Sequence, residues 1–179
     1  MSDNRIAAKQ FQKLCSLSVF PQSTVSGVIV MSTTNNAIIL VARILLSFMF
    51  IMSGFGKLTD PVGTAGMITG AGLPAATALA YLVGLFELVA GLAVLVGFQT
   101  RIVAWALAVF CVFTGLMFHT GTINVPDFPA AANGWINALN GIMLMKNITL
   151  AGAYMLLATF GPGAYSIDAR RGALTGLAA

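Results

Sequence analysis

The chain has very few charged side chains for its length. Of its 179 residues only 8% are Asp, Glu, Lys or Arg, whereas 58% are hydrophobic, and the mean hydropathy is +0.92. A soluble domain carries about 25% charged residues, so this chain has too little polar material to cover a water-facing surface. Disordered, coiled-coil and collagen-like chains are excluded by the same composition. An integral membrane protein made of helices is the class that remains.

Cysteine and histidine are also scarce, which limits the chemistry of the chain. Cys15 and Cys111 are its two cysteines and form no CxxC pair, which argues against a dithiol centre, a disulfide scaffold and a thiolate metal site. His119 is the single histidine, and with Asp127 as its nearest acidic partner it makes a poor metal site. We therefore expect no metal and assign no catalytic residue. Nucleic-acid binding is not expected either, since no basic face exists beyond the first 30 residues.

Four apolar runs are each long enough to cross a bilayer, which takes about 20 residues in a helix. They cover residues 38–56, 75–98, 102–118 and 142–160, and the last helix can begin as early as Trp135. The runs are continuous rather than alternating, which favours helices over strands. Asn133-Gly134 and the prolines before it predict a loop ahead of the fourth run. The fold class predicted is all-α, an integral membrane four-helix transmembrane bundle.

The distribution of basic residues predicts how the bundle is oriented. With four spans both termini lie on one side of the membrane. That side holds seven cations and the other holds Lys57 and Lys146, so both termini are predicted to be cytoplasmic. The predicted division is an N-terminal extension over 1–36, a membrane domain over 37–171 and a tail over 172–179. The extension is expected either to be disordered or not to be translated before Met31.

Glu87 is the strongest candidate for a functional residue. It is the single charged residue in its apolar run and lies near the bilayer centre, about 15 Å from the end of the span. An intramembrane carboxylate either protonates or pairs with a cation, and Arg43 and Lys146 lie within about 6–8 Å of its depth. Glu87 is therefore either a proton-carrying or ligand-binding group, or half of an ion pair that fixes helix register.

Three further cationic or titratable residues lie toward the outer ends of the spans. Lys57, His119 and Lys146 could converge into a pocket suited to an anion or a quinone carbonyl. The alternative is that each side chain extends to headgroups or water. That alternative is weaker for Lys146-Asn147, which lies inside a long helix. The candidate intramembrane residues are Glu87, Lys146, Arg43, Lys57, His119 and Asn147.

Several short motifs follow one another along the membrane part of the chain. The most specific is GPGAYSIDARR at residues 161–171. The others are Ala42-Arg43, Ser53-Gly54, Lys57-Leu58, Gly72-Leu73-Pro74, Glu87 with Gly91 and Gly97, Thr100-Arg101, His119, and Lys146-Asn147 with Gly152. In their order and spacing, from about Ala42 to Arg171, they resemble the DoxX family of small bacterial membrane proteins.

The resemblance implies a multi-pass protein of the bacterial inner membrane with a link to redox chemistry. Relatives are described as membrane subunits of thiosulfate:quinone oxidoreductase, or as partners in complexes that handle thiol and oxidative stress. A quinone cofactor, and redox enzymes or other membrane subunits as partners, are therefore expected beside the lipid bilayer. Two alternatives stay open: an oligomeric small-solute permease or exporter, and a structural membrane module without chemistry. A homo-oligomer also stays open.

Overall fold

The computed structural model describes residues 24–25, 28–29 and 33–176. The chain divides into two compact units, residues 1–35 and 36–179. Within the first unit, β1 (Thr24–Val25) pairs antiparallel with β2 (Val28–Ile29). Met31 and most of the predicted extension lie outside the described residues.

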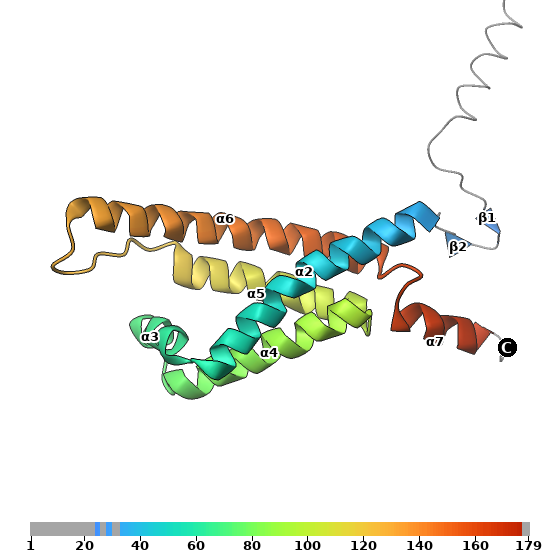
Figure 1. The fold of residues 1–179 in the computed structure, drawn as a ribbon, viewed down its shortest axis with the longest axis horizontal. Helices are drawn as coiled ribbons and strands as arrows, with labels where there is room; N and C mark the ends of the chain where they lie inside the picture. The colour runs from blue at the N-terminus through green and yellow to red at the C-terminus, as the bar shows by residue number, and fades with distance from the viewer. Residues whose placement is uncertain (1–23, 26–27, 30–32, 177–179) are drawn as a thin grey trace, which may run out of the picture. The chain divides into compact units, whose positions relative to one another are not determined.

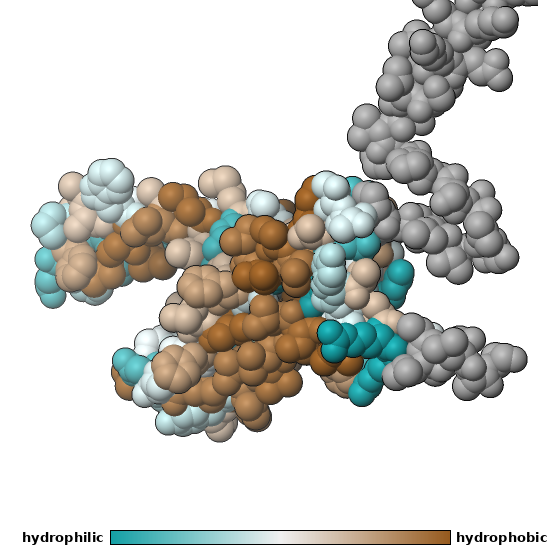
Figure 2. All heavy atoms as spheres, turned by 45° about the vertical axis from the view of Figure 1, so that its right-hand side comes forward, coloured by the Kyte–Doolittle hydropathy of each residue, from teal (hydrophilic) through white to brown (hydrophobic). Residues whose placement is uncertain are grey.

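The rest of the described chain is helical, and four of its helices are long and apolar enough to cross a membrane. These are α2 (Thr33–Thr59), α4 (Ala76–Val96), α5 (Thr100–His119) and α6 (Ala130–Phe160). Two short helices, α3 (Val62–Gly70) and α7 (Ile167–Gly176), lie in the connection from α2 to α4 and after α6 (Figure 1). The all-α, four-span prediction is confirmed. Apolar side chains cover the outside of these helices, as a bilayer requires (Figure 2).

The fourth long helix begins earlier than its hydropathy predicts. Asn133-Gly134 lies inside α6, so the prediction of a loop at that position is wrong. Pro129 is the N-cap of α6, and the side chain of Asn133 binds the backbone of Val125 in the preceding segment. Asn133 is thus a helix residue, and its side-chain amide forms its hydrogen bonds with the backbone of the loop that precedes the helix.

Helices α4 and α5 form an antiparallel hairpin, and α5 packs along α6 (Figure 1). The hairpin turns sharply because Gly97 and Gln99 both adopt left-handed backbone conformations, with φ of 71° and 47°. Leu107, Cys111 and Tyr154 are almost fully buried in the core beyond the turn.

Helix α2 crosses α4 at very short range through a pair of glycines. A Cβ atom on Gly54 would lie 2.5 Å from the Leu88 nitrogen and 2.6 Å from the Gly84 oxygen. Gly84 is equally confined, because a Cβ there would lie 2.9 Å from the Lys57 Cβ. Small residues let two helix backbones approach in this way within a membrane. The crossing thereby determines which side chains of α2 and α4 meet.

Candidate functional site

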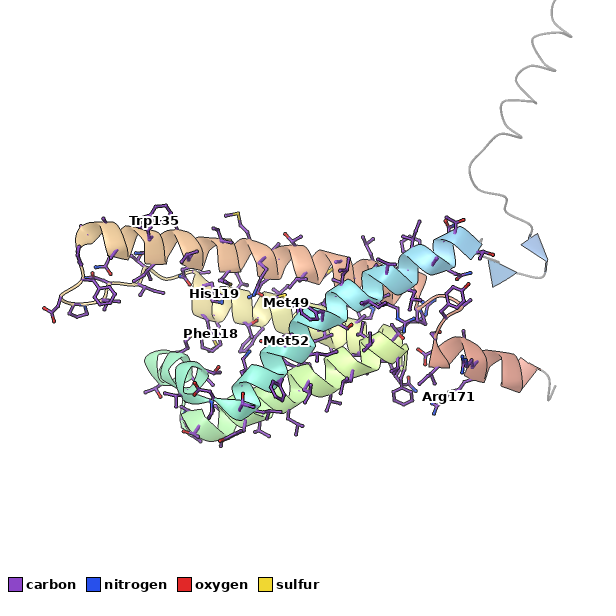
Figure 3. The ribbon with its side chains drawn as sticks, viewed as in Figure 1. Met49, Met52, Phe118, His119, Trp135 and Arg171 are labelled. Carbon is purple, nitrogen blue, oxygen red and sulfur yellow. The ribbon has the colours of Figure 1, made fainter. Side chains whose placement is uncertain are left out.

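A cavity of about 450 Å³ lies within the bundle, with walls from α2, α3, α4, α5 and α6. Most of its lining is apolar or aromatic and includes Met49, Phe50, Ile68, Leu79, Phe110, Phe113 and Phe118. The polar lining includes five of the six residues predicted from sequence, namely Lys57, Glu87, His119, Lys146 and Asn147. Phe118 and His119 lie at the end of α5 that faces α3 (Figure 3). We call this space the intramembrane cavity.

Lys57 and Glu87 form an ion pair on one wall of the cavity. The Lys57 Nζ donates to Glu87 Oε2 at 2.8 Å and to Ser53 Oγ at 2.6 Å. Glu87 is buried, and Lys57 is partly exposed. The partner of Glu87, which sequence left open with Arg43 and Lys146 as cations of suitable depth, is therefore Lys57.

The glycine crossing explains why Lys57 pairs with Glu87. Lys57 and Glu87 each lie three residues after a glycine of that crossing, Gly54 on α2 and Gly84 on α4. Residues three apart share a helix face. The close approach of the two backbones therefore brings the two side chains together, even though Lys57 lies near the end of its predicted span and Glu87 near the middle of its own.

Lys146 reaches the cavity from α6. Within the described part of the chain it makes no hydrogen bond within 3.5 Å and no ion pair within 4.0 Å. Its neighbour Asn147 is buried and packs against Gly115, where a Cβ would lie 3.0 Å from the Asn147 Cβ. Lys146 thus presents an ammonium group to the cavity wall without a protein acceptor.

His119 is held in one orientation by Asn140. Its Nδ1 lies 2.8 Å from Asn140 Oδ1, while Asn140 Nδ2 donates to the backbone oxygens of His119 and Gly121. Since the Asn140 amide nitrogen is already used as a donor, its oxygen faces the ring and His119 Nδ1 carries the hydrogen. The Nε2 atom of the neutral ring is then an acceptor.

An asparagine ladder on α6 was missed from sequence. Asn133, Asn137 and Asn140 bind the backbone of the segment that precedes α6, at Val125, at Ile123, and at His119 and Gly121. Their i, i+4, i+7 spacing places them on one helix face, together with Asn147 seven residues further on. That spacing in an otherwise apolar segment was the signal that could have revealed them.

Arg43 does not line the cavity. It is completely buried at the opposite end of the bundle, where its hydrogen bonds to described residues all go to backbone oxygens. Nε donates to Val94 O at 2.9 Å, Nη1 donates to Pro162 O and Tyr165 O at 3.0 and 2.7 Å, and Nη2 donates to Leu95 O. Arg43 therefore ties α2 to the last turn of α4 and to the segment after α6.

Asp168 at the start of α7 caps a helix 68 residues earlier. Its carboxylate accepts the backbone N–H groups of Gln99 and Thr100 at 2.8 Å, and its own N–H donates to Gly97 O at 2.9 Å. Partial burial raises the pKa of Asp168, but the hydrogen bonds from Thr100 and Gln99 outweigh it and leave that pKa below its ordinary value. We call Arg43, Asp168 and residues 161–166 the C-terminal clamp.

Two further arginines contact the same end of the bundle. Arg101 donates from Nη1 to the backbone oxygens of Ala158 and Thr159 at 3.2 and 2.9 Å. The guanidinium carbon of Arg171 lies 4.8 Å from the centre of the Phe98 ring. The motif at residues 161–171 is thus explained by structural contacts.

The two ends of the bundle differ in what they can do chemically. The clamp has its charged groups fully engaged by the protein. The intramembrane cavity offers two ammonium groups, one carboxylate, an imidazole acceptor and an amide inside an apolar space. A pocket of this size with a few convergent polar groups is the usual form of a small-molecule site.

Comparison with known proteins gives a consistent result. The DoxX family model matches residues 38–120. Inner membrane protein YqjF of Escherichia coli strain K12 is 40% identical over 130 residues, which cover 73% of this chain and 88% of YqjF. Inner membrane protein YphA of the same strain is 33% identical over 133 residues, or 74% of this chain and 89% of YphA. No solved structure matches the chain.

Proposed function

The chain belongs to the DoxX family, and from this premise we propose that it is a multi-pass inner-membrane subunit of a redox-linked complex. Its similarity to two inner membrane proteins over most of their length supports the location. The four helices of spanning length support the membrane embedding. The redox link rests on the family resemblance, and the intramembrane cavity gives it a physical site.

The cavity is the observation that carries the proposal. Its aromatic and aliphatic lining suits the ring and tail of a quinone, and its polar groups suit an oxygen acceptor. Lys146 and Asn147 would hold a carbonyl oxygen or an anionic group, and His119 Nε2 would accept a proton or a hydrogen bond. A bound quinone would supply the electron-carrying chemistry. The proposed function leaves two ligand classes open, a quinone and a small anion.

The proposed orientation places both termini in the cytoplasm. Arg43, Arg101, Arg170 and Arg171 lie on or beside the helix ends of the clamp, whereas Lys57 and Lys146 belong to the cavity end. Positive charge concentrates on the cytoplasmic side of inner-membrane proteins. In this orientation the cavity lies toward the opposite face of the membrane.

Glu87 is proposed to handle a proton through its pairing with Lys57. Replacing Glu87 with Gln keeps its shape but removes the charge, and we expect quinone-dependent activity in native membranes to fall at least about tenfold, as for loss of a positioned acid–base group. Asp127→Asn is the matched control, because Asp127 does not line the cavity. Unchanged activity in Glu87→Gln at normal protein level would remove Glu87 from the mechanism.

Native mass spectrometry of protein extracted gently from its own membranes tests the function itself. A retained quinone, or a co-purifying soluble redox enzyme, is the expected result. A homo-oligomer carrying neither would contradict the proposal and would favour the permease alternative. Liposome flux that depends on Glu87 would then establish that alternative.

A further inference from the structure

We propose that the intramembrane cavity binds an amphipathic molecule with one anionic group, which pairs with Lys146. This inference rests on the proposed use of the cavity as a binding site, but not on the redox link. It selects the anion from the two ligand classes left open above. Three observations support it. The lining carries an excess positive charge, Lys57 is already paired with Glu87, and two apolar lining residues are exposed.

The described lining of the cavity carries one excess positive charge. By formal charge, Lys57 and Lys146 are the two cations among the lining residues and Glu87 is the one carboxylate. Charges are costly within a membrane unless a partner compensates them. A ligand with a single negative charge would bring this lining to neutrality, whereas a neutral carbonyl would leave the excess charge in place.

The pairing pattern shows which lysine is available to the ligand. Lys57 already donates to Glu87 and Ser53 across the α2–α4 crossing. Lys146 comes from α6 and has no acceptor within hydrogen-bonding distance among the described residues. An anionic oxygen at Lys146 Nζ would make a charge-assisted hydrogen bond, which is about twice as strong as a neutral one.

The apolar part of the ligand follows from the remaining lining. Phe113 and Met67 line the cavity and are 56% and 49% exposed. An opening between α3, which carries Met67, and α5, which carries Phe113, would let a hydrophobic tail enter from the bilayer. Figure 2 shows brown, apolar side chains over the lipid-facing surface of the bundle. A carboxylate or sulfonate on an alkyl chain has the required two-ended chemistry.

Binding of decanoate and decanol to the full chain in nanodiscs of zwitterionic lipid tests the proposal. The two probes share their apolar chain and differ in charge at pH 7.5. Binding is measured with radiolabelled probe, after subtraction of the signal from empty nanodiscs. We expect decanoate to bind at least about tenfold more tightly than decanol, as a charge-assisted contact predicts.

Variants of Lys146 identify the contact. Lys146→Met should lower decanoate affinity to that of decanol, whereas Lys146→Arg should retain most of it because the charge is kept. Arg170→Met is the matched control, because Arg170 is exposed and lies outside the cavity, so this substitution removes the same charge elsewhere. The comparison of probes on the unaltered protein needs no variant and therefore does not depend on the variants folding.

Two results would overturn the proposal in different ways. Equal binding of decanoate and decanol, unaffected by Lys146→Met, would show a site for neutral ligands and would leave the quinone function intact. Saturable binding of neither probe would remove the cavity as a binding site and would contradict the proposed function as well. If decanoate binds, native mass spectrometry of protein never exposed to the probe identifies the source. A co-purified long-chain acid indicates the bilayer, and a co-purified water-soluble anion indicates a soluble source.

Discussion

Arg43 and Lys146 are both cations within membrane-spanning helices, but their surroundings differ in kind. The guanidinium of Arg43 is fully buried and donates to four backbone oxygens from two parts of the chain, the last turn of α4 and the segment after α6. The ammonium of Lys146 is partly exposed to a cavity and has no acceptor within hydrogen-bonding distance among the described residues. The hydrogen-bonding capacity of the first cation is filled by the protein, and we propose that a ligand fills that of the second.

The difference teaches how to separate structural from functional charge within a membrane. Intramembrane charges are functional candidates by default. Arg43 is such a candidate when only the sequence is known, yet in the structure its guanidinium N–H groups join backbone segments. The planar guanidinium with its several donors suits this role. A charged side chain whose donors are all bonded to backbone oxygens stabilises the fold. A charged side chain at a cavity with donors that have no acceptor is available to bind a ligand.

The largest expected effect comes from Arg43→Met. Four backbone oxygens would lose the hydrogen bond from arginine, although Val94 O would keep the one from the Gly97 N–H. An unsatisfied buried acceptor costs about 1–3 kcal/mol. We expect the free energy of unfolding in detergent to fall by about 3 kcal/mol or more, measured by thermal or denaturant unfolding. Arg43→Lys should also destabilise, because an ammonium cannot reach four oxygens in one plane. A loss no larger than that of Arg101→Met would contradict a clamp centred on Arg43.

Gly54→Ala tests the crossing that brings Lys57 to Glu87. The added Cβ would meet the backbone of Gly84 and Leu88, so α2 and α4 must separate. Overpacking of this kind costs about 1–3 kcal/mol, and the ion pair should weaken with it. Gly56→Ala is the matched control on the same helix, because a Cβ there meets nothing within 4 Å. Equal stability of the two variants would mean that the crossing is not tight.

Acid should loosen the clamp at Asp168. The pKa of this carboxyl is lowered in the folded state, so the stability that it contributes is present above its unfolded pKa and is lost as pH falls through the folded value. Unfolding midpoints below about pH 4 should therefore drop more steeply in the unaltered protein than in Asp168→Asn. At neutral pH that variant should lose about 1 kcal/mol, as for loss of a helix cap. Parallel pH profiles would contradict this role.

The smallest effect on stability is expected from Lys146→Met. No protein hydrogen bond within 3.5 Å is lost from the described residues, and an uncompensated charge is removed. The free energy of unfolding should not fall by more than about 0.5 kcal/mol. Lys57→Met is the contrast, because it leaves Glu87 buried without its cation and should destabilise. A Lys146→Met loss as large as that of Arg43→Met would end the distinction between the two cations.

The spans and the charged lining of the cavity could be predicted from sequence. A bilayer requires about 20 apolar residues per helix, so hydropathy alone locates the four helices. The rarity of charge within such helices then points to Glu87 and Lys146. Lys57, His119 and Asn147 also reach the predicted cavity, although their functional role stays a prediction.

The partners of these residues could not be predicted, because they depend on helix rotation and crossing. Depth along the membrane normal favoured Arg43 or Lys146 as the partner of Glu87, but the Gly54–Gly84 contact brings Lys57 instead. Arg43 binds oxygens up to 122 residues away, which no local pattern encodes. The asparagine ladder was visible as a spacing, yet asparagine next to glycine also signals a turn.

The sequence separation of the Arg43 contacts has a consequence for the order in which the chain is made. Arg43 is synthesised with the first membrane-spanning helix, but two of its acceptors, Pro162 and Tyr165, follow 119 and 122 residues later. During translation Arg43 therefore lacks two of its four acceptors until α6 and the segment after it have been made. Its position near the helix start lets it reach headgroups in the interval. The segment after α6 thus completes the packing of α2, and a chain that ends before residue 162 lacks two of the four acceptors of Arg43.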